Sequence, residues 1–139
     1  MQPLTLNYTV LADDFSRAGE ASGTVKRTLK ELGFSPELVR RVAIAMYEAE
    51  INMVIHANGG TITAEISPTE IGVVFADRGP GIPDISLAMQ EGWSTATEQV
   101  RDLGFGAGMG LPNMKNNADL LDIQTELGVG TTVYMKFNV

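Results

Sequence analysis

The chain has 139 residues, 44% hydrophobic and 19% charged, a balance that fits one domain over residues 1–139 and argues against intrinsic disorder. Its 17 acidic and 10 basic residues give a net charge of -7, which repels a phosphate backbone and argues against direct nucleic-acid binding. Cysteine is absent, and no apolar stretch approaches the roughly 20 residues of a membrane span, so we expect a cytoplasmic protein without thiolate metal sites.

The first part of the chain predicts one strand and two helices. Residues 4–10 alternate apolar and polar side chains and include β-branched and aromatic residues, as a half-buried strand does. A helix is expected over 15–32, with Gly33 as its stop signal. Ser35 then provides an N-cap, followed by proline and glutamate in the first turn, for a long helix over 36–57.

The rest of the chain predicts four strands interrupted by a glycine-rich segment. The expected elements, in order, are strands over 61–66 and 71–76, a short helix over 84–89, a loop over 92–110, a helix over 111–118, and strands over 120–126 and 131–137. This order predicts an α+β fold, a two-layer α/β sandwich with helices on one face of a mixed, mainly antiparallel sheet.

A first polar cluster lies on the long helix. Glu48 and Asn52 are four residues apart and therefore share one helix face. An asparagine carbonyl is a hard oxygen ligand that suits Mg²⁺, and a carboxylate one turn earlier could accept a hydroxyl proton. The alternative is an ordinary solvated helix face, because this spacing is weak evidence when it stands alone.

A second cluster follows the strand that ends near residue 76. Asp77 precedes Gly79 and Gly81, so a carboxylate would stand beside backbone with little steric bulk. The amino group of a purine base could donate a hydrogen bond to it. A surface turn is the alternative reading, because aspartate and glycine dominate turns.

A third cluster has glycines at alternate positions directly before a predicted helix, where backbone amides could receive phosphate oxygens. They are Gly104, Gly106, Gly108 and Gly110. A flexible linker is the alternative. The segment satisfies neither the P-loop pattern nor the dinucleotide-binding glycine pattern. His56 is the only histidine, so a metal site built from several imidazoles is excluded.

Together these clusters resemble the family of ATPases that unites gyrase, Hsp90, histidine kinases and MutL (GHKL), whose domain has the Bergerat ATP-binding fold. The likeness covers about residues 44–133. Within the family it is strongest to the small anti-sigma-factor serine/threonine kinases and the switch kinases of stressosomes. The motifs that carry it are Asp77-Arg-Gly-Pro-Gly-Ile-Pro-Asp-Ile-Ser86, Gly92-Trp-Ser-Thr95 and Gly106-Ala-Gly-Met-Gly-Leu-Pro112.

The resemblance implies a site for ATP and Mg²⁺ with a role for each cluster. Asn52 would hold Mg²⁺, and Glu48 would be the catalytic base that removes the proton of a serine or threonine hydroxyl. Asp77 would accept from the adenine amine, and Thr132 would support adenine recognition from the final strand. The glycines that would admit the base or wrap the phosphates are Gly79, Gly81, Gly106, Gly108 and Gly110.

The function that this resemblance implies is an ATP-dependent serine/threonine kinase. It would phosphorylate a partner with a sulfate-transporter/anti-sigma-antagonist (STAS) domain and so regulate sigma-factor or stress signalling. A sigma factor or phosphatase as a second partner, and a homodimer, remain open. Two alternatives are a non-catalytic module whose nucleotide decides which protein it holds, and a bare ATPase without a protein acceptor.

Overall fold

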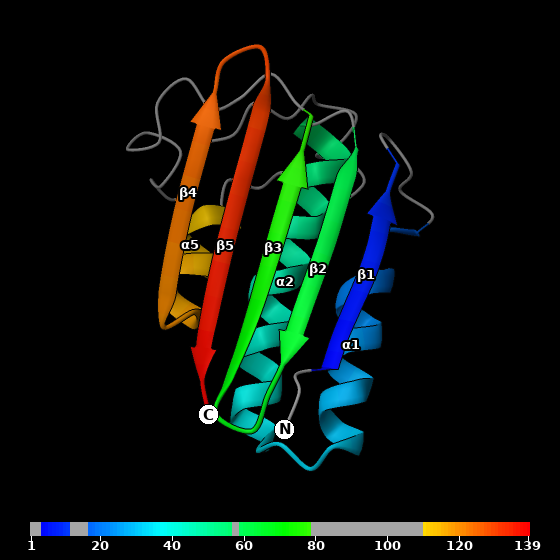
Figure 1. Cartoon of the computed structure of the whole chain (residues 1–139), viewed down its shortest axis with the longest axis vertical. Helices are drawn as coiled ribbons and strands as arrows, with labels where there is room; N and C mark the ends of the chain where they lie inside the picture. The colour runs from blue at the N-terminus through cyan, green and yellow to red at the C-terminus, as the bar shows by residue number, and fades with distance from the viewer. Residues whose placement is uncertain (1–3, 12–16, 57–58, 79–109) are drawn as a thin grey trace.

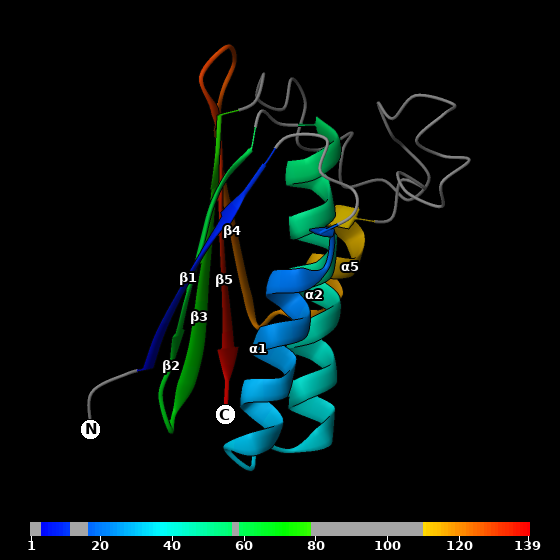
Figure 2. The same ribbon diagram turned by 90° about the vertical axis from the view of Figure 1, so that its right-hand side faces the viewer.

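The computed structural model describes residues 4–11, 17–56, 59–78 and 110–139 of the chain. In these residues it contains five strands and three helices. They are β1 (Leu4–Val10), α1 (Glu20–Glu31), α2 (Pro36–His56), β2 (Gly60–Ile66), β3 (Glu70–Asp77), α5 (Gly110–Asn117), β4 (Leu120–Glu126) and β5 (Gly130–Asn138). The strands form one layer, and the helices form a second layer on one of its faces (Figure 1, Figure 2). This confirms the predicted α+β sandwich.

The strands form one sheet in the order β1-β2-β3-β5-β4. Every described pair is antiparallel, so the described sheet is purely antiparallel and not mixed as the prediction allowed. Two tight connections, β2 to β3 and β4 to β5, bring neighbouring strands together as hairpins. The predicted strands all exist, with bounds that differ from the prediction by at most one residue.

The core lies between the sheet and α2. One face of α2 is buried at Val42, Met46 and Ala49, and it packs against the inward side chains of the central strands. Phe75 of β3 and Phe137 of β5 are almost fully buried. Each such burial stabilises the fold by roughly 1.5–3 kcal/mol. α2 runs along the central strands β2 and β3 on one side of the sheet (Figure 1), so the residues beside its buried face lie at the edge of this core.

The start of α2 agrees with the sequence, whereas the start of α1 does not. Ser35 accepts the backbone N–H of Leu38 at 3.2 Å, as an N-cap does. The predicted helix start at residue 15 is wrong: α1 begins at Glu20, and its N-cap is Gly19 with φ 92°. The physical reason is twofold: Gly19 has a left-handed φ that an α-helix does not continue through, and Glu50 of α2 accepts the first-turn backbone N–H groups of Ala21 and Ser22.

Two further predicted elements, the short helix over 84–89 and the loop over 92–110, fall outside the described residues except for Gly110. Gly110 is the first residue of α5. A search of the described helices for a span of membrane length and apolarity finds none.

Candidate active site

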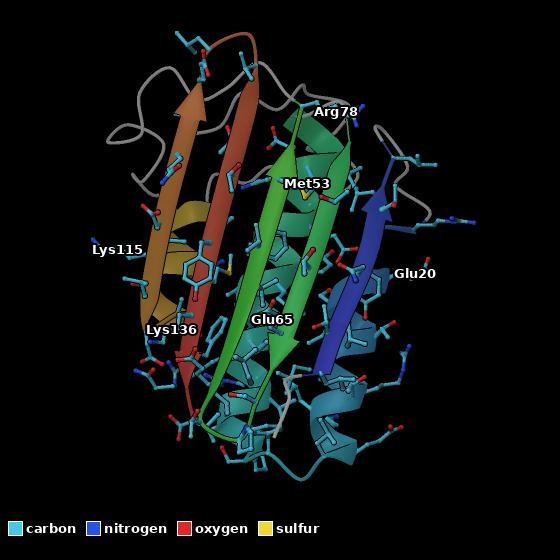
Figure 3. The ribbon with its side chains drawn as sticks, in the orientation of Figure 1. Glu20, Met53, Glu65, Arg78, Lys115 and Lys136 are labelled. Carbon is cyan, nitrogen blue, oxygen red and sulfur yellow. The ribbon has the colours of Figure 1, made fainter. Side chains whose placement is uncertain are left out.

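The strand-end aspartate and the C-terminal part of α2 lie at one end of the sandwich, and Gly110, the described glycine of the third cluster, begins the helix that packs beside α2. β3 ends at Asp77, β5 begins at Gly130, and α5 begins at Gly110. The C-terminal half of α2 reaches the same end, where Figure 1 shows it behind the tips of β2 and β3. Met53 of α2 extends toward these tips, with Arg78 just beyond β3 (Figure 3). The fold therefore brings the helix cluster beside the strand-end aspartate.

Glu48 and Asn52 lie one turn apart on α2, and both are half-buried. Glu48 is held by a residue that the sequence did not predict for the site: Asn113 of α5 donates from Nδ2 to Glu48 Oε1 at 3.1 Å. The donor and acceptor are 65 residues apart in sequence. The helix pair α2 and α5 therefore gives this carboxylate a defined orientation.

Asp77 is fixed at the end of β3 by the start of β5. Its Oδ1 accepts the backbone N–H of Thr131 at 2.9 Å. Two glycines make this approach possible. A Cβ at Gly130, where φ is 152°, would lie 2.2 Å from the Asp77 carbonyl oxygen, and a Cβ at Gly60 would lie 2.8 Å from Asp77 Cα. Strands β2 and β5 therefore crowd around Asp77 so closely that only glycine fits.

The two threonines at the start of β5 lie on opposite faces of the sheet. Thr131 is 7% exposed, and its hydroxyl is 3.0 Å from the Thr125 hydroxyl on β4. Thr132, the residue expected to support adenine, has an exposed side chain. Because Thr131 shares its face with buried Val133, its side chain is on the helix side, and that of Thr132 is on the far side.

The expected phosphate-binding and base-admitting glycines are mostly outside the described residues. Gly79, Gly81, Gly106 and Gly108 are in this group. Gly110 is described, and it opens α5, whose first-turn amides have no partner within the helix. The roles of all five glycines therefore stay predictions.

The residues present fit a hard divalent cation. Asn52 offers a neutral amide oxygen on the same side of α2 as Glu48. The described residues contain no cluster of three or more histidine, aspartate or glutamate side chains that could hold a metal unaided. An ion at Asn52 would therefore take most of its ligands from phosphates and water, as Mg²⁺ commonly does.

Sequence reasoning missed Asn113 and Thr131. Thr131 could have been found by counting inward positions along the last strand, because alternate residues share a face. Asn113 carries no such signal, because nothing local links it to Glu48. The sequence also offered no sign that Glu50, two residues after Glu48, is buried and accepts the backbone N–H groups of Ala21 and Ser22.

A separate cavity of about 250 Å³ lies between β1 and the start of α1. Its lining includes Tyr8, Arg17 and Glu50, and none of the residues assigned to the nucleotide. It borders Glu50 and not Glu48, so we treat it as distinct from the candidate active site.

Similarity to known protein families identifies the class of protein to which the chain belongs. Residues 11–137 match the histidine kinase-like ATPase domain, so the chain belongs to that family. Serine/threonine-protein kinase RsbT of Bacillus subtilis is 31% identical over 112 residues, which are 78% of each chain. Anti-sigma F factor of Shouchella clausii is 32% identical over 139 residues, covering 96% of this chain and 90% of that protein.

A solved structure supports the fold. The RsbU and RsbW domains of a Mycobacterium tuberculosis protein match with a TM-score of 0.65 at 17% identity, over 96% of this chain and 32% of that chain. The family match and the two curated relatives confirm the resemblance expected from the sequence: the chain is a relative of the anti-sigma-factor kinases. ATP is the nucleotide that membership of this family implies.

Proposed function

We propose that this chain is an ATP-dependent serine/threonine protein kinase of the anti-sigma-factor and switch-kinase type. The observation that carries the proposal is the geometry of α2, on which half-buried Glu48 and Asn52 lie one turn apart. Glu48 is also oriented by the hydrogen bond from Asn113. The kinship with RsbT and with anti-sigma F factor supports the same activity.

In this proposal Asp77 recognises adenine by accepting a hydrogen bond from its amino group. Its Oδ1 is engaged by the Thr131 amide, which holds the carboxylate at the end of β3. Thr131 is better placed than Thr132 to support the base, because it contacts Asp77 and its side chain is on the helix side. Gly79 and Gly81 would give the base room to approach the backbone.

Gly106, Gly108 and Gly110 would wrap the phosphates, and Asn52 would hold Mg²⁺ through its amide oxygen. The ion, when bound, supplies charge neutralisation and alignment of the phosphates. Asn52 would set its position relative to Glu48, because the two side chains leave the same face of one helix. Asn52 adds no charge of its own, so the site keeps affinity for an anionic ligand.

Glu48 would act as the general base. As the acceptor hydroxyl oxygen bonds to the γ-phosphorus and the bond to the departing ADP oxygen breaks, Glu48 takes the hydroxyl proton. The partially buried position of Glu48 keeps the carboxylate close to its target with little freedom to turn away. Most of the rate gain would come from this alignment.

The partner is proposed to be an anti-sigma-factor antagonist with a STAS domain, and the phosphoacceptor one of its serine or threonine hydroxyls. The names of the relatives support a role in sigma-factor control. A part in stress signalling, a second partner such as a sigma factor or phosphatase, a homodimer and a cytoplasmic location all stay proposals.

The test compares four purified proteins with labelled Mg-ATP and a lysate of the source organism. Wild type should label one protein band, which mass spectrometry should identify as carrying phosphoserine or phosphothreonine. Glu48→Ala should abolish the label but retain binding of a fluorescent ATP analogue. Asp77→Asn should lose analogue binding, although its amide oxygen can still accept the Thr131 N–H. Glu65→Ala, at an exposed position of β2, is the matched control.

Other results of this assay would favour the non-catalytic binding module or the bare ATPase. Nucleotide binding without any labelled band would refute the kinase and leave a nucleotide-gated binding module. Release of phosphate with no protein acceptor would indicate a bare ATPase. A labelled band that persists in Glu48→Ala would remove Glu48 from the chemistry.

A further inference from the structure

The hydrogen bond between Asn113 and Glu48 joins two elements that the sequence keeps far apart. Asn113 lies in the first turn of α5, directly after the glycine-rich segment, and Glu48 lies in the second half of α2. Asn113 Nδ2 and Glu48 Oε1 are 3.1 Å apart, and both side chains are half-buried. An ionised carboxylate can only accept, so the amide nitrogen of Asn113 must face it.

Asn113 is held in place by its own surroundings. Its neighbours in sequence, Pro112 and Met114, are buried, the latter with 1% exposure. One turn later, Asn117 Nδ2 donates to the Asn113 carbonyl at 2.7 Å. The packing of α5 on α2 therefore fixes the position of the Asn113 side-chain amide.

The far end of α5 is tied to α2 as well. Arg41 Nε donates to the Asn117 carbonyl at 3.0 Å, and Arg41 Nη2 lies 3.0 Å from Asp119 Oδ1. With both ends of α5 attached, the amide of Asn113 is presented to Glu48 by a rigid helix pair. A glutamate has three side-chain torsions, and one fixed oxygen removes much of that freedom.

We infer that Asn113 is a positioning residue for Glu48: it holds Oε1 so that Oε2 is presented to the hydroxyl of the protein acceptor. This inference rests on the proposed kinase function. It assigns Asn113 no contact with nucleotide or acceptor. Because a small misplacement of a reacting group can cost about 100-fold in rate, loss of the hydrogen bond should lower kcat.

A purely structural role would have different consequences. If the hydrogen bond only joined α5 to α2, replacing Asn113 would lower stability and leave the kcat of the folded protein unchanged. Leucine and glutamine separate the two roles, because leucine removes the donor and glutamine keeps it. Aspartate keeps the shape of asparagine but places a second carboxylate beside Glu48. Like charges repel, so Glu48 would turn away or take up a proton, and either change disables it as a base.

The experiment measures phosphoryl transfer by wild type, Asn113→Leu and Asn113→Asp, using the acceptor identified with wild-type protein. Asn116→Leu and Asn116→Asp are the matched controls, because Asn116 is an exposed asparagine on the same helix. Each variant is also assayed for binding of a fluorescent ATP analogue and for its unfolding midpoint. These two measurements separate effects on kcat from effects on nucleotide affinity and folding.

We expect both Asn113 variants to lower kcat by roughly tenfold or more, the range for a lost hydrogen bond to a charged group. Analogue affinity should change by less than about twofold, because neither variant touches the proposed nucleotide contacts. Asn113→Gln should recover part of the activity, since it keeps the donor. The Asn116 variants should match wild type.

The outcomes distinguish this inference from the proposed function. If wild type transfers phosphate and Glu48→Ala does not, but the Asn113 variants have the kcat of the Asn116 controls, the positioning role is overturned and the kinase stands. The same holds if the Asn113 variants lose activity only in proportion to nucleotide affinity. If wild type transfers no phosphate to any protein, the proposed function fails first, and the positioning role fails with it.

Discussion

Glu50 and Glu48 lie two residues apart on α2, and we expect their removal to have opposite consequences. Glu50 is 3% exposed. Its Oε1 accepts the Ser22 amide at 3.0 Å, and its Oε2 accepts the Ala21 amide at 3.1 Å. These amides are in the first turn of α1, where N–H groups have no partner within the helix. Glu50 therefore caps α1 from a neighbouring helix.

The magnitude follows from these contacts. Glu50→Ala removes two hydrogen bonds to a charged acceptor, each worth about 1.5–3 kcal/mol. Part of that loss is offset, because the cost of burying the carboxylate also disappears. We therefore expect the free energy of unfolding to fall by about 3 kcal/mol, equivalent to roughly 10 °C in Tm for a domain of this size. Glu50→Gln should lose about half as much, because it keeps one acceptor oxygen.

Urea unfolding followed by circular dichroism measures this loss directly. Glu65→Ala removes an exposed carboxylate from β2 and should change the free energy by less than about 0.5 kcal/mol. Glu48→Ala should lose less stability than Glu50→Ala while losing phosphoryl transfer, because it removes one hydrogen bond of a half-buried carboxylate and not two of a buried one. Glu50→Ala should do the reverse, retaining transfer below its lowered Tm. A stability loss no larger than that of Glu65→Ala would refute the capping role of Glu50.

Three further changes have defined outcomes. Gly130→Ala should abolish nucleotide binding in fluorescence titrations, because its Cβ would lie 2.2 Å from the Asp77 carbonyl oxygen and displace that residue. Tyr8→Phe should raise stability by up to about 1 kcal/mol, because in the described structure the Tyr8 hydroxyl oxygen is buried without a hydrogen-bond partner. Burial also raises the pKa of the Tyr8 hydroxyl above 10.0. The contribution of Tyr8 to the free energy of unfolding is therefore fully present below pH 10.0 and is lost as pH rises through the raised pKa. Tyr8→Phe should not show this loss at alkaline pH. The hydrogen bond from the backbone N–H of Asn138 lowers the pKa of Asp119 below 3.8. The contribution of the Asp119 carboxylate to the free energy of unfolding is therefore present above pH 3.8 and is lost as pH falls through the lowered pKa. In Asp119→Asn the free energy of unfolding should fall less steeply at acid pH.

Each of these has a control or a contrary result. Gly128→Ala is the control for Gly130→Ala, since Gly128 is in the same hairpin, also has positive φ, and a Cβ there would meet no atom within 4 Å. Equal nucleotide affinity of these two variants would contradict the steric argument. Destabilisation by Tyr8→Phe would mean that the hydroxyl has a partner in solution. An unchanged acid limb in Asp119→Asn would show that the carboxylate contributes nothing as an anion.

Local patterns accounted for most of the secondary structure. The alternation over residues 4–10 predicted β1 with the bounds that the structure has, because one sheet face is buried and the other is not. Ser35 and the proline after it predicted the start of α2, because an N-cap acts within one turn. The motifs that begin at Asp77, Gly92 and Gly106 carried the resemblance to the family, because each is short and contiguous in sequence.

Contacts between distant segments decided the rest. The start of α1 depends on Glu50 of α2, which accepts the first backbone N–H groups of the helix, so no pattern within residues 15–32 could locate it. The choice between Thr131 and Thr132 depends on strand register, because a shift of one residue moves a side chain to the other face of the sheet. The partner of Glu48 emerges only when α5 packs on α2, because hydrogen bonds between helices depend on their relative placement and not on spacing along the chain.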